Sequence, residues 1–295
     1  MKNRFREQYL FHCILLSFTM AMLVFGFFIW RGNGAFTVVD DFNLQQLTFA
    51  SAVRNAIRGN GVGEWVWNLD LGASLVTGFS FYNLGSPFFW PSVLFGEGSF
   101  PYLAGYLYVI KYVVASITAY LFLKRFVGQH GYAVVGSLLY AFSGFQTTNL
   151  EFFHFHDVVA LFPLLLWGLE MAVEDKRKKY WFIFAVFVNC LVNYFFFIEE
   201  VIFLILYFCV RYWGKPIKEF AREGLMCMFC GIIGVGMAGI LFVPNIIYAL
   251  GNSRSSRVWY LEDLIYQPKE ILFIIKGILF PGDAMNAQSA IDDTN

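Results

Sequence analysis

The sequence has 295 residues, of which 58% are hydrophobic and 20% are aromatic, and its mean hydropathy is +0.59. A soluble domain has roughly 45–50% apolar residues, so this composition excludes a protein surrounded only by water and predicts a polytopic membrane protein. Lysine plus arginine and aspartate plus glutamate number 21 each, so the net charge gives no support for a nucleic-acid partner.

Apolar stretches close to the roughly 20 residues that a helix needs to cross a bilayer recur along the chain. They predict an all-α fold with about seven transmembrane helices. The stretches cover residues 9–30, 101–123, 131–149, 158–173, 180–197, 200–213 and 224–250. The fourth and sixth are short, so either can be tilted or joined to its neighbour as a re-entrant pair. We expect a transmembrane module over residues 1–250 and a separate segment over 251–295.

Basic residues predict the orientation of these spans. In this arrangement the bases between spans gather on one side of the membrane, which the positive-inside rule makes cytoplasmic. They are Lys2, Arg4, Arg6, Lys124, Arg125, Lys176, Arg177, Lys178, Lys179, Arg211, Lys215, Lys218 and Arg222. We therefore expect the N-terminus in the cytoplasm, and residues 31–100 and 251–295 outside. The first span is longer than the apolar region of a secretory signal, so we expect an uncleaved anchor.

The large first external loop contains two adjacent acids, Asp40 and Asp41. From Asp41 to Arg58, apolar and polar residues are interleaved at helical spacing, which predicts an amphipathic helix lying along the membrane surface. The two acids fit an N-cap and a first-turn acid that stabilise this helix. They also fit a general base or a cation ligand just above the membrane, where a lipid-linked substrate presents its head group. The local sequence leaves both interpretations open.

A second group of polar residues lies between the third and fourth predicted spans. It contains Glu151, His154, His156 and Asp157. On a short loop these side chains can face the same external pocket as Asp41. An E-x-x-H-x-H-D string can bind a divalent metal, although interfacial histidines more commonly hydrogen-bond to backbone or water. A metal is thus possible, and no other cofactor is indicated.

Three further charged residues fall within or beside apolar segments, where an unpaired charge is unfavourable. Lys111 lies in the middle of the second span, so we expect it to point inward, toward an acidic or phosphate partner. Glu199 and Glu200 lie where the fifth and sixth spans meet. At membrane depth they would mark a wet functional surface, whereas at the interface they would merely cap a turn.

Several of these segments resemble the YfhO family of bacterial membrane proteins, which belongs to the GT-C class of glycosyltransferases. After its first span the family has an acid followed four residues later by glutamine, as in Asp41 and Gln45; Asp40 stands where family members often have glycine. NLDLGASLVTGFSFYNLGSPFFW, FHDVVALFPLLLWGLE and FVPNIIYALGNSRSSR are similar to later family motifs. The resemblance covers residues 40–257. Family members are usually much longer, so the chain resembles their N-terminal part.

The resemblance implies a GT-C-like module that moves a sugar from a polyprenyl-phosphate donor to an acceptor outside the membrane, such as teichoic acid. A carboxylate must take the proton of the acceptor hydroxyl, and we expect Asp41, or else Asp40, to be this base. Substrate binding, including the match to the phosphate charge, is expected from Gln45, Arg54, Arg58, Lys111, His154, His156, Asp157, Glu199 and Glu200. We also expect Asp41 and Asp157 to share one lipid-facing cavity.

Two other classes of function are compatible with the sequence. A transporter or lipid flippase would place Lys111, Glu199 and Glu200 along a translocation path, but the spans show no inverted or parallel repeat. A non-catalytic subunit would instead scaffold a cell-envelope complex, with a partner subunit supplying the C-terminal part of longer family members. The expected partners are therefore membrane lipid, a lipid-linked sugar, a polymer acceptor and such a subunit.

Overall fold

The computed structural model describes residues 2–61, 65–67, 69, 72–251 and 272. These residues are predominantly helical, which confirms the all-α prediction. The chain divides into one unit over Met1–Ile247 and a second over Tyr248–Asn295. The predicted external segment 251–295, with the last of the family motifs, lies outside the described residues apart from 251 and 272.

The longer helices follow one another in a simple order. They are α1 (Lys2–Arg31), α2 (Leu47–Asn60), α4 (Phe100–Leu123), α5 (His130–Ala141), α7 (Phe155–Glu174), α8 (Lys179–Val192), α9 (Tyr194–Arg211), α10 (Ile217–Met237) and α11 (Gly239–Leu250). Shorter elements connect them: the π-helical turns η1 (Phe42–Gln46) and η2 (Ser80–Leu84), the 3-10 turns η3 (Trp90–Leu94) and η4 (Lys176–Lys178), the helices α3 (Leu75–Phe79) and α6 (Gly144–Thr148), and the paired strands β1 (Trp65–Val66) and β2 (Ala73–Ser74).

Among the described residues, four helices are long and apolar enough to cross a membrane: α1 from Gln8, α4, α7 and α10. The count of about seven spans stays a prediction. Two predicted spans are each divided into two helices, since α5 and α6 separate near Ser143, and α10 and α11 separate at Ala238. Asn193 separates α8 from α9 because its backbone is extended and its side chain accepts hydrogen bonds from the N–H groups of Phe195 and Phe196.

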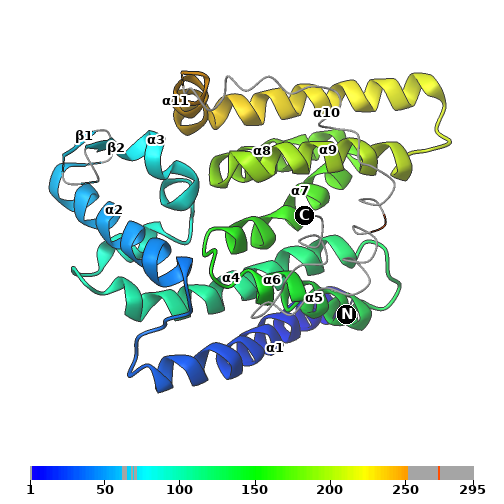
Figure 1. Cartoon of the computed structure of the whole chain (residues 1–295). Helices are drawn as coiled ribbons and strands as arrows, with labels where there is room; N and C mark the ends of the chain where they lie inside the picture. The colour runs from blue at the N-terminus through cyan, green and yellow to red at the C-terminus, as the bar shows by residue number, and fades with distance from the viewer. Residues whose placement is uncertain (1, 62–64, 68, 70–71, 252–271, 273–295) are drawn as a thin grey trace. The chain divides into compact units, whose positions relative to one another are not determined.

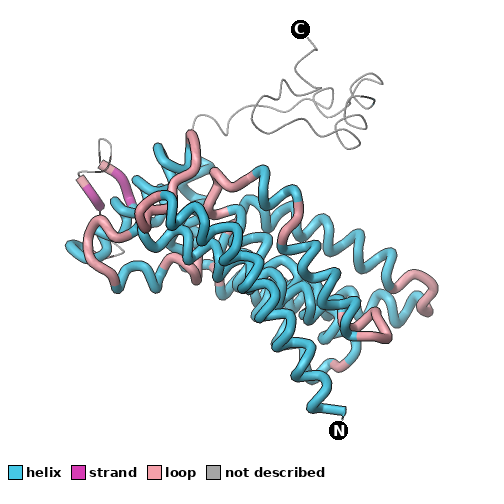
Figure 2. Tube along the Cα trace, turned by 90° about the horizontal axis from the view of Figure 1, so that it is seen from below, coloured by secondary structure: helices cyan, strands magenta, loops and turns pink. Residues whose placement is uncertain are grey.

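The long helices pack side by side in the order α1, α4, α7, α8 and α10, with α5 beside α1 and α4 (Figure 1). The connecting loops gather toward the two ends of these helices (Figure 2). At Gly168 in α7, an added Cβ would lie 3.0 Å from both the Cα atom of Phe182 and the carbonyl oxygen of Trp181 in α8. Glycine at this position, part of one family motif, therefore lets the two helices approach closely.

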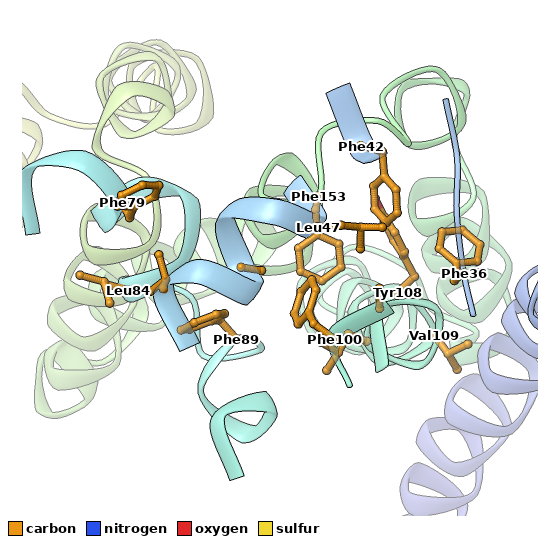
Figure 3. Packing of buried hydrophobic residues seen from close by; sticks show 14 of the residues in the cluster. Phe36, Phe42, Leu47, Phe79, Leu84, Phe89, Phe100, Tyr108, Val109 and Phe153 are labelled. Atoms are coloured by element: carbon orange, nitrogen blue, oxygen red, sulfur yellow. The ribbon is translucent and has the colours of Figure 1, made fainter. Parts of the chain in front are cut away.

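The segment between α1 and α4 lies at the end of the bundle where α1 ends and α4 begins (Figure 1). A helix is present where the amphipathic one was predicted, but its apolar side is covered by protein. Phe42 and Val53 are fully buried, and Phe42 lies near Phe36 and Tyr108 in the aromatic cluster of Figure 3. The prediction that this helix rests on lipid is thus corrected, because α4 and the segment itself supply its apolar partner.

Close packing also makes a prediction about Gly85, the residue that ends η2. A Cβ at this position would collide with the backbone carbonyl oxygen of Leu191 in α8, which cannot rotate away as a side chain can. We expect Gly85→Ala to lower the free energy of unfolding by about 1–3 kcal/mol. Denaturant titration in detergent micelles measures this change.

Gly78 in α3 provides the matched control, because an added Cβ there meets no atom within 4 Å. Gly78→Ala should leave the stability unchanged or raise it by about 0.5–1 kcal/mol, since alanine restricts the unfolded chain. Equal destabilisation by the two substitutions would contradict the close approach of η2 to α8.

Candidate functional site

A polar cavity lies where four segments that are distant in the sequence meet. Its volume is about 320 Å³, and its polar lining residues are Asp41, Gln45, Gln46, Tyr82, His154 and Asn193. They come from the start of η1, from η2, from the turn before α7 and from the junction of α8 with α9. Phenylalanine side chains complete the wall. This space is called the Asp41 cavity below.

Local hydrogen bonds hold the chain around Asp41. The side chain of Asn43 accepts from the N–H of Val38 at 3.2 Å and donates to its carbonyl oxygen at 2.7 Å, which closes the preceding loop. Asp40 has a φ of +44°, in the left-handed region that favours glycine. This geometry accounts for the glycine that family members often have at this position, and it leaves Asp41 to present its carboxylate to the cavity.

The carboxylate of Asp41 does not act as a helix cap. Its side chain makes no capping hydrogen bond to η1, although Asp41 directly precedes this turn. Instead, Gln45 Nε2 donates to Asp41 Oδ1 at 2.5 Å, so the acid and the glutamine of the family motif contact each other. One carboxylate oxygen is thereby oriented by the protein, and the second has no protein donor among the described residues.

His154 forms the opposite side of the cavity. Its Nδ1 lies 3.1 Å from Gln46 Oε1, across 108 positions of sequence. Burial and the neighbouring charges of Lys111 and His156 lower the pKa of His154 to about 3. The imidazole is therefore neutral at physiological pH, and Nδ1 can donate its proton to Gln46. Burial and the charge of Asp41 also raise the pKa of Tyr82, which keeps this phenol neutral.

An ion pair lies within the protein between α4 and α7. Lys111 Nζ is 2.6 Å from Asp157 Oδ1 and donates to the carbonyl oxygen of Phe153 at 2.7 Å, with both charged side chains at most 1% exposed. The acidic partner expected for Lys111 is thus Asp157. The expectation that Asp157 shares the cavity of Asp41 is corrected, because Asp157 does not line that cavity and His154 does. Lys111 is likewise unavailable to a phosphate there.

The remaining residues of the E-x-x-H-x-H-D string point to different surroundings. His156 contacts the carbonyl oxygens of Gln146 and Phe152 through its two ring nitrogens and stacks on Tyr112. Its imidazole is buried behind the cavity rather than exposed to it. Among the described residues, no three His, Cys, Asp or Glu side chains are arranged to hold a metal ion. The proposed chemistry therefore includes no metal-dependent step.

Arg54 and Arg58 fix the loop that leads into α4. Arg54 is 1% exposed and donates hydrogen bonds of 2.7–3.1 Å. Its acceptors are the carbonyl oxygens of Ser92, Phe95 and Gly96 and the hydroxyl of Ser99. Arg58 donates to the carbonyl oxygen of Phe95 at 2.6 Å. Neither arginine lines the Asp41 cavity, so both act on the loop and not on a phosphate in that cavity.

Glu199 and Glu200 also lie outside the Asp41 cavity. Both line a neighbouring groove along α9, in which Glu200 is buried and Glu199 is exposed. The structure thus gathers Asp41, Gln45 and His154 from the predicted set, and separates the others.

Three cavity residues were absent from the predicted set: Gln46, Tyr82 and Asn193. Gln46 directly follows Gln45, but only the fold shows that it faces His154. Tyr82 belongs to one of the quoted family motifs, which was a usable signal. Asn193 interrupts an apolar segment directly before α9, and a polar break of this kind also marks an element boundary.

The described part of the chain is thus an all-α membrane protein that carries a carboxylate-bearing polar cavity at one end of its helices. A family model described as bacterial membrane protein YfhO matches residues 13–272, and the chain belongs to this family. It is 25% identical over 179 residues to the uncharacterized protein YfhO of Bacillus subtilis (strain 168), a match that covers 59% of this chain and 20% of that protein. The chain thus spans about a fifth of this relative's length. No solved structure matches.

Proposed function

We propose that the chain is a membrane glycosyltransferase that moves a sugar from a polyprenyl-phosphate donor to an acceptor outside the membrane, such as teichoic acid. The observation that carries this proposal is the Asp41 carboxylate, which lines a polar cavity and is oriented by Gln45. Membership of the YfhO family supports the proposal.

In the proposed reaction Asp41 acts as the general base. Its free oxygen takes the proton of the acceptor hydroxyl while the hydroxyl oxygen attacks the anomeric carbon of the donor sugar. The new carbon–oxygen bond forms as the bond to the phosphate breaks, and the polyprenyl phosphate leaves with the electron pair. Donors on the cavity wall, such as the amide of Asn193, would bind the sugar hydroxyls.

An apolar groove supports a lipid-linked donor. It has a volume of about 550 Å³ and is lined almost entirely by apolar side chains of α8, α9 and α10, including Phe197, Phe208 and Ile232. Phe197 lies one residue after Phe196, which lines the Asp41 cavity. A prenyl chain in this groove would therefore run along α9 away from the cavity, with its phosphate toward the cavity.

A transfer assay tests the proposal. Right-side-out membrane vesicles from cells that produce the chain should transfer label from a radiolabelled polyprenyl-phosphate sugar to an acidic envelope polymer. Vesicles without the chain should not, and inside-out vesicles should transfer only after permeabilisation, because the cavity is proposed to be external. Absence of transfer by the wild-type chain in every preparation would contradict the proposal and favour a scaffolding subunit.

A further inference from the structure

A second recess adjoins the Asp41 cavity along α5, α7 and α9. It has a volume of about 300 Å³, and its aromatic lining residues are Tyr140, Phe145, Phe155, Phe162, Phe196 and Phe203. Phe155 and Phe196 line both spaces, and their rings meet edge to face with centroids 4.7 Å apart. We call this recess the Glu200 groove.

The groove contains an unpaired buried acid. Glu200 is 6% exposed, and neither of its carboxylate oxygens has a hydrogen-bond partner among the described residues. Glu199 lines the same groove, and no lysine or arginine does so within the described chain. A buried carboxylate without a partner is strongly unfavourable, so a ligand that supplies positive charge and N–H donors would relieve an existing deficit.

We propose that the Glu200 groove binds the primary ammonium group of an aminophospholipid. An ammonium group brings three N–H donors to the two carboxylates, and the faces of the aromatic rings attract a cation. The apolar walls match the acyl chains. Glu200 lies six residues after Tyr194, the first residue of α9, which places it about 9 Å along the helix axis. This depth is near the inner edge of a head-group layer of about 5–8 Å.

Phosphatidylethanolamine, phosphatidylcholine and phosphatidylglycerol distinguish the chemistry of the ligand. In nanodiscs that contain the three lipids in equal amounts, native mass spectrometry should find phosphatidylethanolamine enriched on the wild-type chain. Phosphatidylcholine is cationic at its head but has no N–H donor, and phosphatidylglycerol has no cation, so neither should be enriched. Equal retention of all three lipids would overturn the proposal.

Glu200→Gln tests the residue. It keeps the shape of the side chain but removes the charge, so enrichment should fall at least about tenfold with the loss of a charge-assisted hydrogen bond. Without phosphatidylethanolamine the variant should be at least as stable as the wild type, because it removes an unpaired buried charge. Unchanged enrichment in Glu200→Gln would refute the assignment.

Two further variants separate this site from general effects of charge and shape. Glu219→Gln removes the same charge from the exposed start of α10 and should retain full enrichment. Val158→Trp should fill the groove and abolish enrichment while both acids remain. Loss of enrichment in Glu219→Gln, or its persistence in Val158→Trp, would show that the lipid binds elsewhere. These binding measurements need no sugar transfer, so the inference stands apart from the proposed enzymatic function.

Discussion

Asp41→Asn should lower the rate of sugar transfer about 10²- to 10⁴-fold, the usual contribution of a general base. An amide has the same shape as the carboxylate but cannot take the proton of the acceptor hydroxyl. The fold should be retained, because the amide oxygen can still accept the hydrogen bond of Gln45 Nε2 that Asp41 Oδ1 accepts at 2.5 Å. Label transfer in membranes, normalised to the amount of folded chain, measures the effect.

Asp40→Gly is the matched control for this experiment. The φ of +44° at Asp40 is a conformation that glycine adopts freely, so the substitution relieves strain while it loosens the unfolded chain. These effects oppose each other, and we expect the stability to stay within about 1 kcal/mol of wild type. Transfer should be retained. If Asp40→Gly abolishes transfer and Asp41→Asn does not, Asp40 is the base.

The second large effect is expected at the buried ion pair. Lys111→Met or Asp157→Leu alone should lower the free energy of unfolding by about 3–5 kcal/mol, because each leaves one charge without its partner in the protein interior. The pair is fully enclosed, with Nζ and Oδ1 only 2.6 Å apart, so water cannot replace the missing partner. Denaturant titrations of the purified variants in one detergent measure the loss.

The double variant Lys111→Met/Asp157→Leu tests the coupling. Removing both charges also removes their desolvation, so the double variant should be more stable than either single variant. A loss equal to the sum of the two single losses would mean that the charges act independently, in conflict with the observed contact. The double variant also shows whether transfer requires the pair itself or only a stable scaffold beneath His154.

Some features of the candidate site follow from local sequence alone. Asp41 and Gln45 are four positions apart, so one helical turn brings their side chains together, as observed. A lysine in the middle of an apolar helix must find an acidic partner within the protein, and Lys111 does. The apolar stretches likewise fix the all-α membrane class, because a helix satisfies its own backbone groups in lipid.

Other features depend on how the helices pack. The sequence did not show that His154, rather than Asp157, faces the Asp41 cavity, or that Gln46 contacts His154 across 108 positions. Such contacts depend on the rotation and separation of helices that meet only in the folded chain. The covering of α2 by protein was hidden for the same reason, since an amphipathic pattern gives a helix an apolar side but does not say whether lipid or protein covers it.

The sequence by itself thus determined the class of protein, most helix positions and the contact between Asp41 and Gln45, because these depend on composition and on residues a few positions apart. Only the tertiary structure decided that Arg54 binds loop carbonyls, that Asp157 pairs with Lys111, and that Glu200 belongs to a separate groove. A charged side chain has a fixed chemistry, but its partner is whichever group the packed helices place within hydrogen-bonding distance.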